Sequence, residues 1–383
     1  MGFLKRFFTK TIRNVLKIPL FSYCFIAILK LFKRNKFVDD HIFNIEILEK
    51  YNVNSHSSSL NKLPLSFNNK KFDLAIIVPC FNVEKYISEC ADSILNQITD
   101  YKIQLIFVDD GSTDNTGQIL EKKYKNHDGV TIIHQQNHGL SSARNTGIKH
   151  CLASYITFVD SDDYICNPHI FNNILKFIKS LSLSKTDRVI VGYRFSKNSG
   201  NGARKKNKKR ILVKSTNCFK LKGFACGKVY SSELFSNVCF PDGYWFEDTI
   251  NSLLLFHMAN KSFLINDDGY YYRKHENTIT KSSIKNYKAI DTFYITSSVI
   301  HDYFALDIKS HYINRSLMRQ IAYNYKRLQG FGEDINKSVF VETRKLISRY
   351  SISKNVGLKY HHIYQSLVKN NYSLYKIACK VTQ

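Results

Sequence analysis

Short apolar runs alternate with amphipathic segments from residue 72 onward. Four runs have the length and β-branched content of buried strands: 74–78, 103–108, 130–134 and 156–159. Three segments between them carry apolar residues near helical spacing and predict helices: 83–97, 116–124 and 141–151. Because strands joined through helices take right-handed crossovers, the pattern predicts an α/β domain with a mainly parallel central sheet flanked by helices.

The composition changes on both sides of this domain. Residues 51–71 are rich in Asn and Ser and predict a linker, whereas residues 285–383 carry apolar positions among basic ones and predict helices. We expect four parts: a basic amphipathic N-terminal segment (1–50), the linker (51–71), the α/β domain (72–284) and a helical C-terminal region (285–383). The helical region caps the α/β domain, mediates self-association or adds a membrane-facing surface.

Positive charge is concentrated at the N-terminus of a chain whose net charge is +25. Residues 1–36 contain nine Lys or Arg residues, no acidic residue and an apolar run at 18–29. A helix that spans a bilayer needs about 20 apolar residues. The shorter run therefore predicts a basic helix that lies in the membrane interface, attracted to anionic lipid. A signal peptide and an ordinary helix packed on the domain are the alternatives, although no small-residue cleavage site follows the run.

Other features bear on location and partners. The nine cysteines lack zinc-site spacing, and their scatter favours reduced thiols in the cytosol. Basic residues at 204–210 lie in a Gly- and Asn-rich stretch, which predicts a solvated hairpin tip or a contact with anionic lipid or an acceptor. No nucleic-acid recognition motif accompanies the charge, so we expect peripheral membrane association and no nucleic acid.

Candidate chemistry gathers at three predicted strand ends. The run at 156–159 is followed by Asp160, Asp162 and Asp163, and carboxylates this close raise one another's pKa values. A divalent cation relieves such repulsion, and a solvated acidic turn is the alternative. Unusual residues also follow the first two runs, Pro79-Cys80-Phe81-Asn82 and Asp109-Asp110-Gly111-Ser112. Because ligands bind beyond the carboxyl ends of parallel strands, these three ends together predict a site.

Four sequence blocks carry a resemblance to a known family. They are Ile77-Val78-Pro79-Cys80-Phe81-Asn82, Phe107-Val108-Asp109-Asp110-Gly111-Ser112-Thr113-Asp114, Asn137-His138-Gly139-Leu140-Ser141-Ser142-Ala143-Arg144-Asn145-Thr146-Gly147, and Phe158-Val159-Asp160-Ser161-Asp162-Asp163. In this order and spacing they resemble the blocks of a family two inverting glycosyltransferase of the bacterial polysaccharide or lipopolysaccharide type. The resemblance covers about residues 72–280 and implies the GT-A fold, which is Rossmann-like.

The resemblance implies a site for a nucleotide-sugar donor. Pro79, Phe81 and Asp110 would line the nucleoside pocket, with Asp109 as their partner on the sheet side. Phe81 offers a flat face to a nucleobase, and an aspartate accepts a hydrogen bond from an imide or a ribose hydroxyl.

The same resemblance assigns the diphosphate and the metal. Asn137 and Arg144 would help to hold the nucleotide sugar, because a guanidinium contacts phosphate in a bidentate way. The alternative for Arg144 is an arginine on a helix surface. Asp160 and Asp162 form the family's Asp-x-Asp element, which binds Mg²⁺ or Mn²⁺ beside the diphosphate, with Asp162 the more direct ligand and Asp163 behind it.

The segment at 241–249 resembles the acceptor side of the family's site. Asp248 would take the proton of the acceptor hydroxyl, and Glu247 would orient or contact the acceptor. The alternative is that both acids begin a helix and interact with its dipole. Arg273 and His275 match a segment that closes over the diphosphate in relatives, with a plain surface role as the alternative. The block at 225–230, which contains Lys228, resembles an acceptor-side strand.

These residues predict a metal-dependent transfer of a sugar from a nucleotide-diphosphate sugar, UDP-linked, to a hydroxyl of a glycan or lipid-linked acceptor. The resemblance implies a role in cell-surface polysaccharide, capsule or lipopolysaccharide synthesis at the cytoplasmic face of the bacterial inner membrane. Two alternatives remain: a nucleotidyltransferase, which also uses metal-bound carboxylates, and a catalytically silent relative that acts as a binding or assembly partner. The silent form would have been indicated by loss of Asp162 or Asp248, and both are present.

Overall fold

The computed structural model describes residues 37–51, 57–61, 65, 67–196, 221–274 and 286–382, and the backbone of 212–213. The chain divides into two compact units. The sheet unit comprises residues 56–243 and 247–275, and the helical unit comprises residues 1–55, 244–246 and 276–383. The basic N-terminal helix, the basic run at 204–210 and His275 were predicted for residues outside the described part of the chain.

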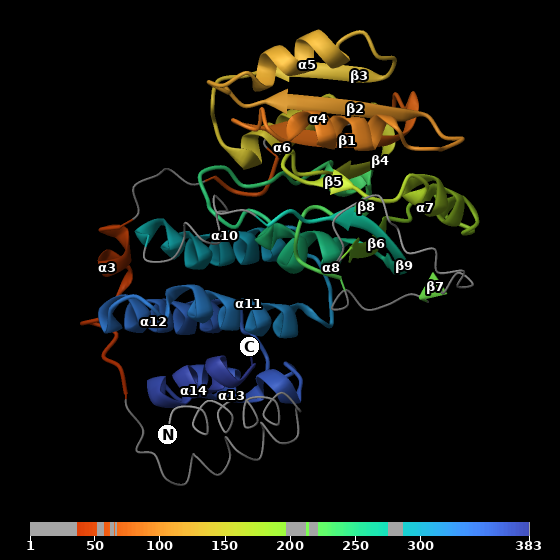
Figure 1. Cartoon of the computed structure of the whole chain (residues 1–383). Coiled ribbons are helices and arrows are strands. Elements are labelled where there is room, and N and C mark those ends of the chain that lie inside the picture. The colour runs from red at the N-terminus through yellow and green to blue at the C-terminus, as the bar shows by residue number, and fades with distance from the viewer. Residues whose placement is uncertain are drawn as a thin grey trace, which may run out of the picture. The chain divides into compact units, whose positions relative to one another are not determined.

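The sheet unit is built on one mixed sheet with the strand order β3-β2-β1-β4-β8-β6-β9-β5, and β7 pairs with β9 (Figure 1). The strands are β1 (Phe72–Cys80), β2 (Ile103–Asp109), β3 (Val130–His134), β4 (Ala153–Phe158), β5 (Tyr164–Ile165), β6 (Val189–Ser196), β7 (Leu212–Val213), β8 (Lys228–Ser231) and β9 (Lys261–Tyr271). Strands β1 to β4 are parallel to their neighbours in this group, and β8 runs antiparallel to β4 and β6. The predicted α/β fold is confirmed. Parallel pairing joins β1 to β4, as the apolar runs predicted, and also joins β6 to β9.

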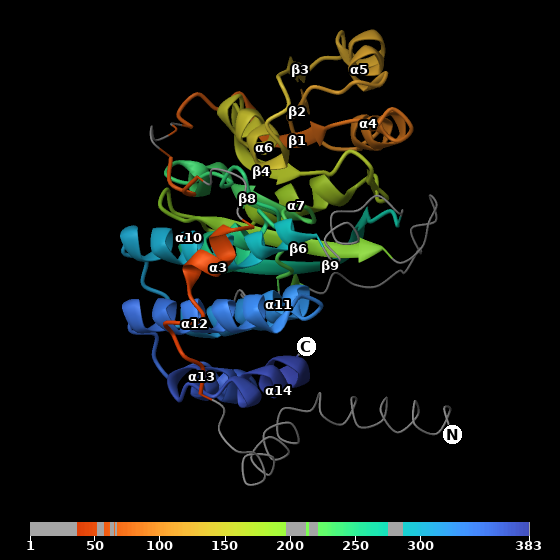
Figure 2. The ribbon, with the colours of Figure 1, turned by 90° about the vertical axis from the view of Figure 1, so that its left-hand side faces the viewer.

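Helices cover both faces of the parallel strands. Helices α4 (Ile87–Leu95) and α5 (Thr116–Tyr124) lie on one side of β1 and β2, and α6 (Leu140–Lys149) lies on the other (Figure 2). Gly147 allows α6 to approach the sheet closely, because a Cβ at this position would lie 2.3 Å from Cγ2 of Ile77. The sheet unit also contains α7 (Ile170–Lys179), a 3-10 helix at Ser232–Phe235, a π-helix at Asn251–Leu255 and α8 (Phe256–Met258).

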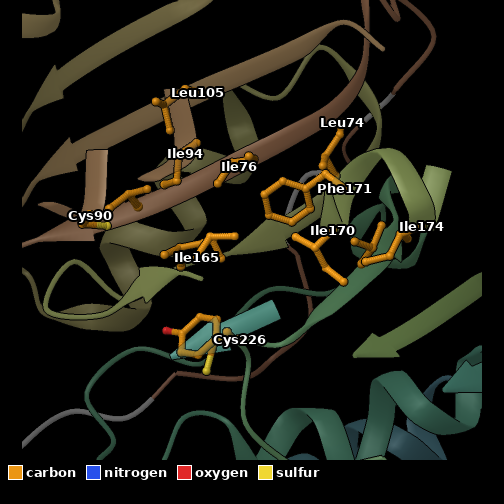
Figure 3. Packing of buried hydrophobic residues seen from close by; sticks show 14 of the residues in the cluster. Leu74, Ile76, Cys90, Ile94, Leu105, Ile165, Ile170, Phe171, Ile174 and Cys226 are labelled. Carbon is orange, nitrogen blue, oxygen red and sulfur yellow. The ribbon is translucent and has the colours of Figure 1, made fainter. Parts of the chain in front are cut away.

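The core of the sheet unit lies between β1, β2, α4 and α7. Figure 3 shows Leu74 and Ile76 of β1 with Ile94 of α4 and Phe171 of α7, and all four are buried. Burial of side chains of this size stabilises a domain by about 1.5–3 kcal/mol each. This packing holds the strand ends that carry the candidate site.

Part of the predicted linker is packed on the sheet unit. Leu60 forms an antiparallel bridge with Val238, and the N–H of Cys239 donates to the carbonyl of Ser59 over 2.8 Å. The side-chain amide of Asn61 donates to three backbone carbonyls, those of Phe235, Ser236 and Val238. The Asn and Ser residues that suggested a linker thus satisfy backbone groups of a neighbouring segment.

The helical unit confirms the predicted helical C-terminal region. Its elements are α3 (Ile45–Glu49), a 3-10 helix at Tyr287–Ile290, α10 (Asp291–Ala305), α11 (Ile313–Leu328), α12 (Glu333–Arg349), a 3-10 helix at Leu358–Tyr360, α13 (His361–Val368) and α14 (Tyr372–Thr382). Leu48 of α3 packs with Phe293, Leu328 and Val339 in a core of its own. In the described residues, no helix combines the length and the apolar content that crossing a bilayer requires.

Candidate active site

The carboxyl ends of β1 and β2 bring the first two predicted blocks together. Cys80 pairs with Asp109 in the parallel register. Beyond the strands, the N–H of Asn82 donates to Oγ of Ser112 over 3.1 Å, and Oδ1 of Asn82 accepts from the N–H of Thr113 over 2.8 Å. Asn82 has a φ of 52°, a left-handed conformation that Asn tolerates better than most residues. The two loops therefore form one surface beside Phe81, whose ring is 46% exposed.

The two aspartates after β2 are buried and hold neighbouring segments. Oδ2 of Asp109 lies 2.9 Å from Nδ1 of His134, and Oδ1 accepts from the N–H of Ser112. Burial lowers the pKa of His134, but its hydrogen bonds to the carboxylates of Asp109 and Glu121 outweigh this effect, so the pKa is raised. Pro79 is buried in β1 and pairs with Val108, one position before Asp109 in the register.

Asp110 holds the loop that leads into α6. Its Oδ1 accepts from Nε2 of Gln135 and from the N–H of His138, and its Oδ2 accepts from the N–H of Gly139. The side chain of Asn137 in this loop is exposed. A Cβ on Gly111 would lie 2.8 Å from the backbone N of Asn137, so the close approach of the two loops requires glycine.

The acidic strand end after β4 contains one buried carboxyl group whose pKa is raised. Asp163 is 1% exposed. Burial, and then the charges of Asp160 and Asp162, raise the pKa of Asp163 to about 8. The hydroxyl of Tyr270 donates to its Oδ2 over 2.6 Å, and the N–H of Arg273 donates to its Oδ1 over 2.8 Å. Sequence reasoning did not identify Tyr270, because it lies 107 residues away and only β9 brings it here.

Arg144 links two candidate regions that lie far apart in the sequence. Its guanidinium donates from Nη2 to Oδ1 of Asp160 over 3.0 Å and from Nη1 to Oε1 of Glu247. The side chain is 3% exposed and lies over the ring of Phe240, 5.3 Å from its centroid. Burial lowers the pKa of Arg144, but the charges of Glu247 and Asp160 raise it more. The interpretation of Arg144 as a helix-surface arginine is therefore wrong, because α6 turns this residue towards Asp160 and the buried Glu247.

Glu247 and Asp248 occupy a turn with unusual backbone on both sides. Phe246 has a φ of 67° immediately before the pair, and the π-helix begins at Asn251. Left-handed conformations of bulky residues and π-helical turns both occur often at functional sites. Glu247 is buried, whereas Asp248 is only partly buried. Nδ2 of Asn251 donates to the backbone carbonyl of Asp248 over 3.1 Å and fixes the turn.

Lys228 is a buried cation on β8 that acts electrostatically on Asp248. Its Nζ donates to the carbonyl of Cys226 over 3.1 Å. Burial lowers the pKa of Lys228 to about 8, although the charge of Asp248 partly opposes this shift. The sequence signal for this residue was a lysine within an apolar strand, between Cys226 and Val229.

Arg273 lies beside the acidic strand end. Its Nε donates to the backbone carbonyl of Asp162 over 2.8 Å, and its Nη2 donates to Glu89. The guanidinium lies over the rings of Tyr86 and Tyr164, 5.0 and 5.6 Å from their centroids. These contacts hold a cation next to the carboxylates on which the metal prediction rests.

The donor groups at this strand end fit a hard divalent cation that shares its ligands with a substrate. Among the described residues, no three His, Cys, Asp or Glu side chains form a complete metal site. Mg²⁺ is commonly held by only one or two carboxylates together with substrate phosphates. Asp160, whose side chain is 30% exposed, and the partly buried Asp162 are the residues that would hold it.

Comparisons with known proteins agree with this geometry. Residues 75–231 match the family model described as Glycosyl transferase family 2. The chain is 35% identical over 227 residues to the uncharacterized glycosyltransferase EpsJ of Bacillus subtilis. This match covers 55% of the chain and 64% of EpsJ, so the chain spans less than two thirds of that relative's length. It is 30% identical over 246 residues to the glycosyltransferase GlyG of Streptococcus pneumoniae, covering 60% of this chain and 80% of GlyG.

A solved structure shows the same fold. S. aureus TarS 1–349, also solved in complex with UDP-GlcNAc, aligns with a TM-score of 0.60 and 21% identity over 79% of this chain and 89% of TarS 1–349. The fold, the sequence matches and the order of the blocks confirm the predicted family. The chain belongs to glycosyl transferase family 2.

Proposed function

We propose that this protein is a metal-dependent inverting glycosyltransferase that moves a sugar from a UDP-linked donor to a hydroxyl of a glycan or lipid-linked acceptor. The observation that carries the proposal is the double contact of Arg144 with Asp160 and Glu247. Asp160 belongs to the predicted donor and metal element, and Glu247 belongs to the predicted acceptor side. One buried guanidinium therefore joins both halves of a transferase site.

The residues divide the reaction between them. Asp248 accepts the proton as the acceptor oxygen attacks the anomeric carbon, while the bond from that carbon to the diphosphate oxygen breaks and the nucleoside diphosphate leaves with the electron pair. Glu247 is held by Arg144 beside this base. A cation bound at Asp160 and Asp162 would stabilise the negative charge of the leaving diphosphate.

The nucleoside end of the donor would lie against the loops after β1 and β2. The exposed ring of Phe81 offers a stacking surface for a nucleobase. Asp109 and Asp110 shape this region through their contacts with His134 and with the N–H groups of His138 and Gly139. Arg273 supplies positive charge close to the position proposed for the diphosphate.

The relatives support a proposal for the cellular role. EpsJ and GlyG carry glycosyltransferase names, and TarS has been solved with UDP-GlcNAc, so UDP-GlcNAc is the first donor to test. We place the reaction in cell-surface polysaccharide synthesis, of the capsule or lipopolysaccharide kind, at the cytoplasmic face of the inner membrane. Residues 1–36 would provide a peripheral membrane contact.

The test measures UDP release from a panel of UDP-sugars, with Mg²⁺, with Mn²⁺ and with a chelator. We expect release to require a cation and to fall at least 100-fold in Asp162→Asn and Asp248→Asn. Asp128→Asn, which changes an exposed acid in the loop before β3, is the matched control and should retain activity. Pyrophosphate release from a nucleoside triphosphate and a sugar phosphate would instead indicate a nucleotidyltransferase. Donor binding without release, unchanged by Asp248→Asn, would indicate a silent relative.

A further inference from the structure

The positive charge of this protein is unevenly distributed between its two units. Residues 57–196 and 221–274 of the sheet unit contain 20 Lys or Arg and 20 Asp or Glu residues. Residues 286–382 of the helical unit contain 15 basic and six acidic residues. The catalytic chemistry proposed above does not use this excess charge, because all of its residues lie in the sheet unit.

One face of α11 combines basic and aromatic side chains. Arg315, Arg319 and Tyr323 follow one another at intervals of four residues, and Tyr312 precedes them by three, so all four share a face. Tyr312 is 41% exposed and Tyr323 is 47% exposed. The sequence contains no acidic residue from 308 to 332.

The 3-10 helix at Leu358–Tyr360 extends this face. A Cβ on Gly357 would lie 3.9 Å from Cδ and Nε of Arg315, which places the start of this turn against the arginine. Burial lowers the pKa of Lys359, and the nearby charges of Arg315 and Arg319 lower it further. Leu358, beside this lysine, is 63% exposed. The sequence has no acidic residue after Glu342.

We propose that Arg315, Arg319 and Lys359, together with the exposed Leu358 and Tyr323, form a surface that docks the helical unit on an anionic lipid bilayer. Arginine binds phosphate groups of lipid heads in a bidentate way, and leucine and tyrosine enter the interface between heads and chains. We call these five residues the lipid-docking face.

Leu358, the exposed leucine of the lipid-docking face, distinguishes a bilayer from soluble polyanions as the partner. A nucleic acid or a phosphate-rich polymer would neutralise the three cations equally well, but it would leave Leu358 in water. A lipid surface uses both features, since basic residues attract anionic heads and the leucine side chain gains by leaving water. The inference does not depend on the proposed reaction.

The test is cosedimentation of the full-length protein with vesicles of phosphatidylcholine alone and of phosphatidylcholine with about one third phosphatidylglycerol. Each basic residue near an anionic surface strengthens binding about fivefold. We therefore expect Arg315→Gln/Arg319→Gln/Lys359→Gln to lower partitioning on anionic vesicles about 100-fold, and Leu358→Ser to lower it several-fold. The control is Lys337→Gln/Lys345→Gln/Lys376→Gln, which removes the same charge from α12 and α14.

The outcomes separate the possibilities. Far-UV circular dichroism confirms that each variant is folded, and UDP release in solution should be unchanged in all of them. A smaller loss in the control triple than in the face triple supports the lipid-docking face. Equal losses in both triples would show that only total charge matters, and unchanged partitioning of Leu358→Ser would remove the apolar contact; either result overturns the proposal. Loss of affinity for a soluble polyanion with unchanged vesicle binding would assign the face to a different partner.

Discussion

Replacing Arg144 with methionine tests whether one guanidinium holds the proposed site together. The substitution removes a cation that is 3% exposed and leaves two carboxylates behind. The side chain of Glu247 is 9% exposed, so its charge would stay buried without compensation, whereas that of Asp160 is 30% exposed and is screened by water. Breaking a buried ion pair by removing one partner costs about 3–5 kcal/mol. Because only one of the two acids is deeply buried, we expect Arg144→Met to cost about 3 kcal/mol.

A double-mutant cycle isolates this contribution. Glu247→Gln removes the buried charge, so the combined variant no longer contains an uncompensated carboxylate at this position. We expect a coupling free energy of about 2 kcal/mol between the two positions, within the range for residues that contact each other. Urea unfolding, followed by far-UV circular dichroism and fitted for each unit's transition, provides the free energies of unfolding. Additivity within about 0.5 kcal/mol would refute the bridging role.

Arg144→Lys separates charge from geometry. A lysine at this position keeps a positive charge, but a single ammonium group cannot reach Asp160 and Glu247 with the fixed spacing of two Nη atoms. We expect UDP release to fall at least tenfold while more of the stability is retained than in Arg144→Met. Full activity in the lysine variant would show that the site needs only a charge here.

Four further changes follow from individual contacts. Lys228→Met should raise the free energy of unfolding by up to about 3 kcal/mol at pH 7. This gain should vanish as pH rises from about 8 to 10.5, because over that range the unfolded wild-type chain keeps the proton of the Lys228 amine and the folded chain loses it. The wild-type protein should be more stable than His134→Gln at low pH, by less than about 1 kcal/mol because His134 is half-exposed. This difference in stability should disappear as pH rises through the raised pKa of His134. Phe81→Ala should raise the KM for the donor about tenfold with little change in kcat, measured by UDP release, because base stacking is worth about 1–3 kcal/mol. Asp162→Asn should abolish the increase in Tm that UDP with Mn²⁺ produces in the wild type.

Each of these expectations has a result that contradicts it. A constant stability difference for Lys228→Met between pH 7 and 10.5 would mean that its amine titrates normally in the fold. A difference for His134→Gln that grows with pH would reverse the sign of its linkage to Asp109. For Phe81→Ala, an unchanged KM would remove the nucleobase contact. For Asp162→Asn, a cation-dependent rise in Tm equal to that of the wild type would place the metal elsewhere.

The parallel half of the sheet was predictable because its strands carry their own signal. Each is a short apolar run that is buried on both faces, and helices follow at regular intervals, so a local pattern determines the order of elements. The rest of the sheet, which mixes antiparallel and parallel pairs, was less visible. Strand β6 pairs with β9 in a register that joins residues about 72 positions apart, such as Val189 with Lys261, and no local pattern encodes that pairing. Helix α4 begins at Ile87, later than the predicted residue 83, and the N–H groups of Val83 and Glu84 donate to side chains after β2.

The candidate site shows the same limit at the level of single residues. The acidic strand end and the Glu-Asp pair could be identified from sequence, since both are unusual clusters of charge. The contact that relates them could not, because Arg144 and Glu247 are 103 residues apart and either orientation of α6 is compatible with its sequence. Tyr270 was missed because, although its segment resembles one that closes over the diphosphate, nothing in the sequence shows that its hydroxyl meets Asp163.

The proposed site also has costs that packing alone does not require. Asp163 and Lys228 are both buried ionisable groups whose pKa values are shifted towards the neutral form, to about 8 in each case, and Phe246 adopts a left-handed backbone conformation. Each feature lowers stability, and costs of this kind are often found at functional sites. If these features belong to the transfer reaction, substitutions that relieve them should stabilise the fold and impair UDP release together. A variant such as Lys228→Met that gained stability and kept full activity would show that the strain around Asp248 is unrelated to catalysis.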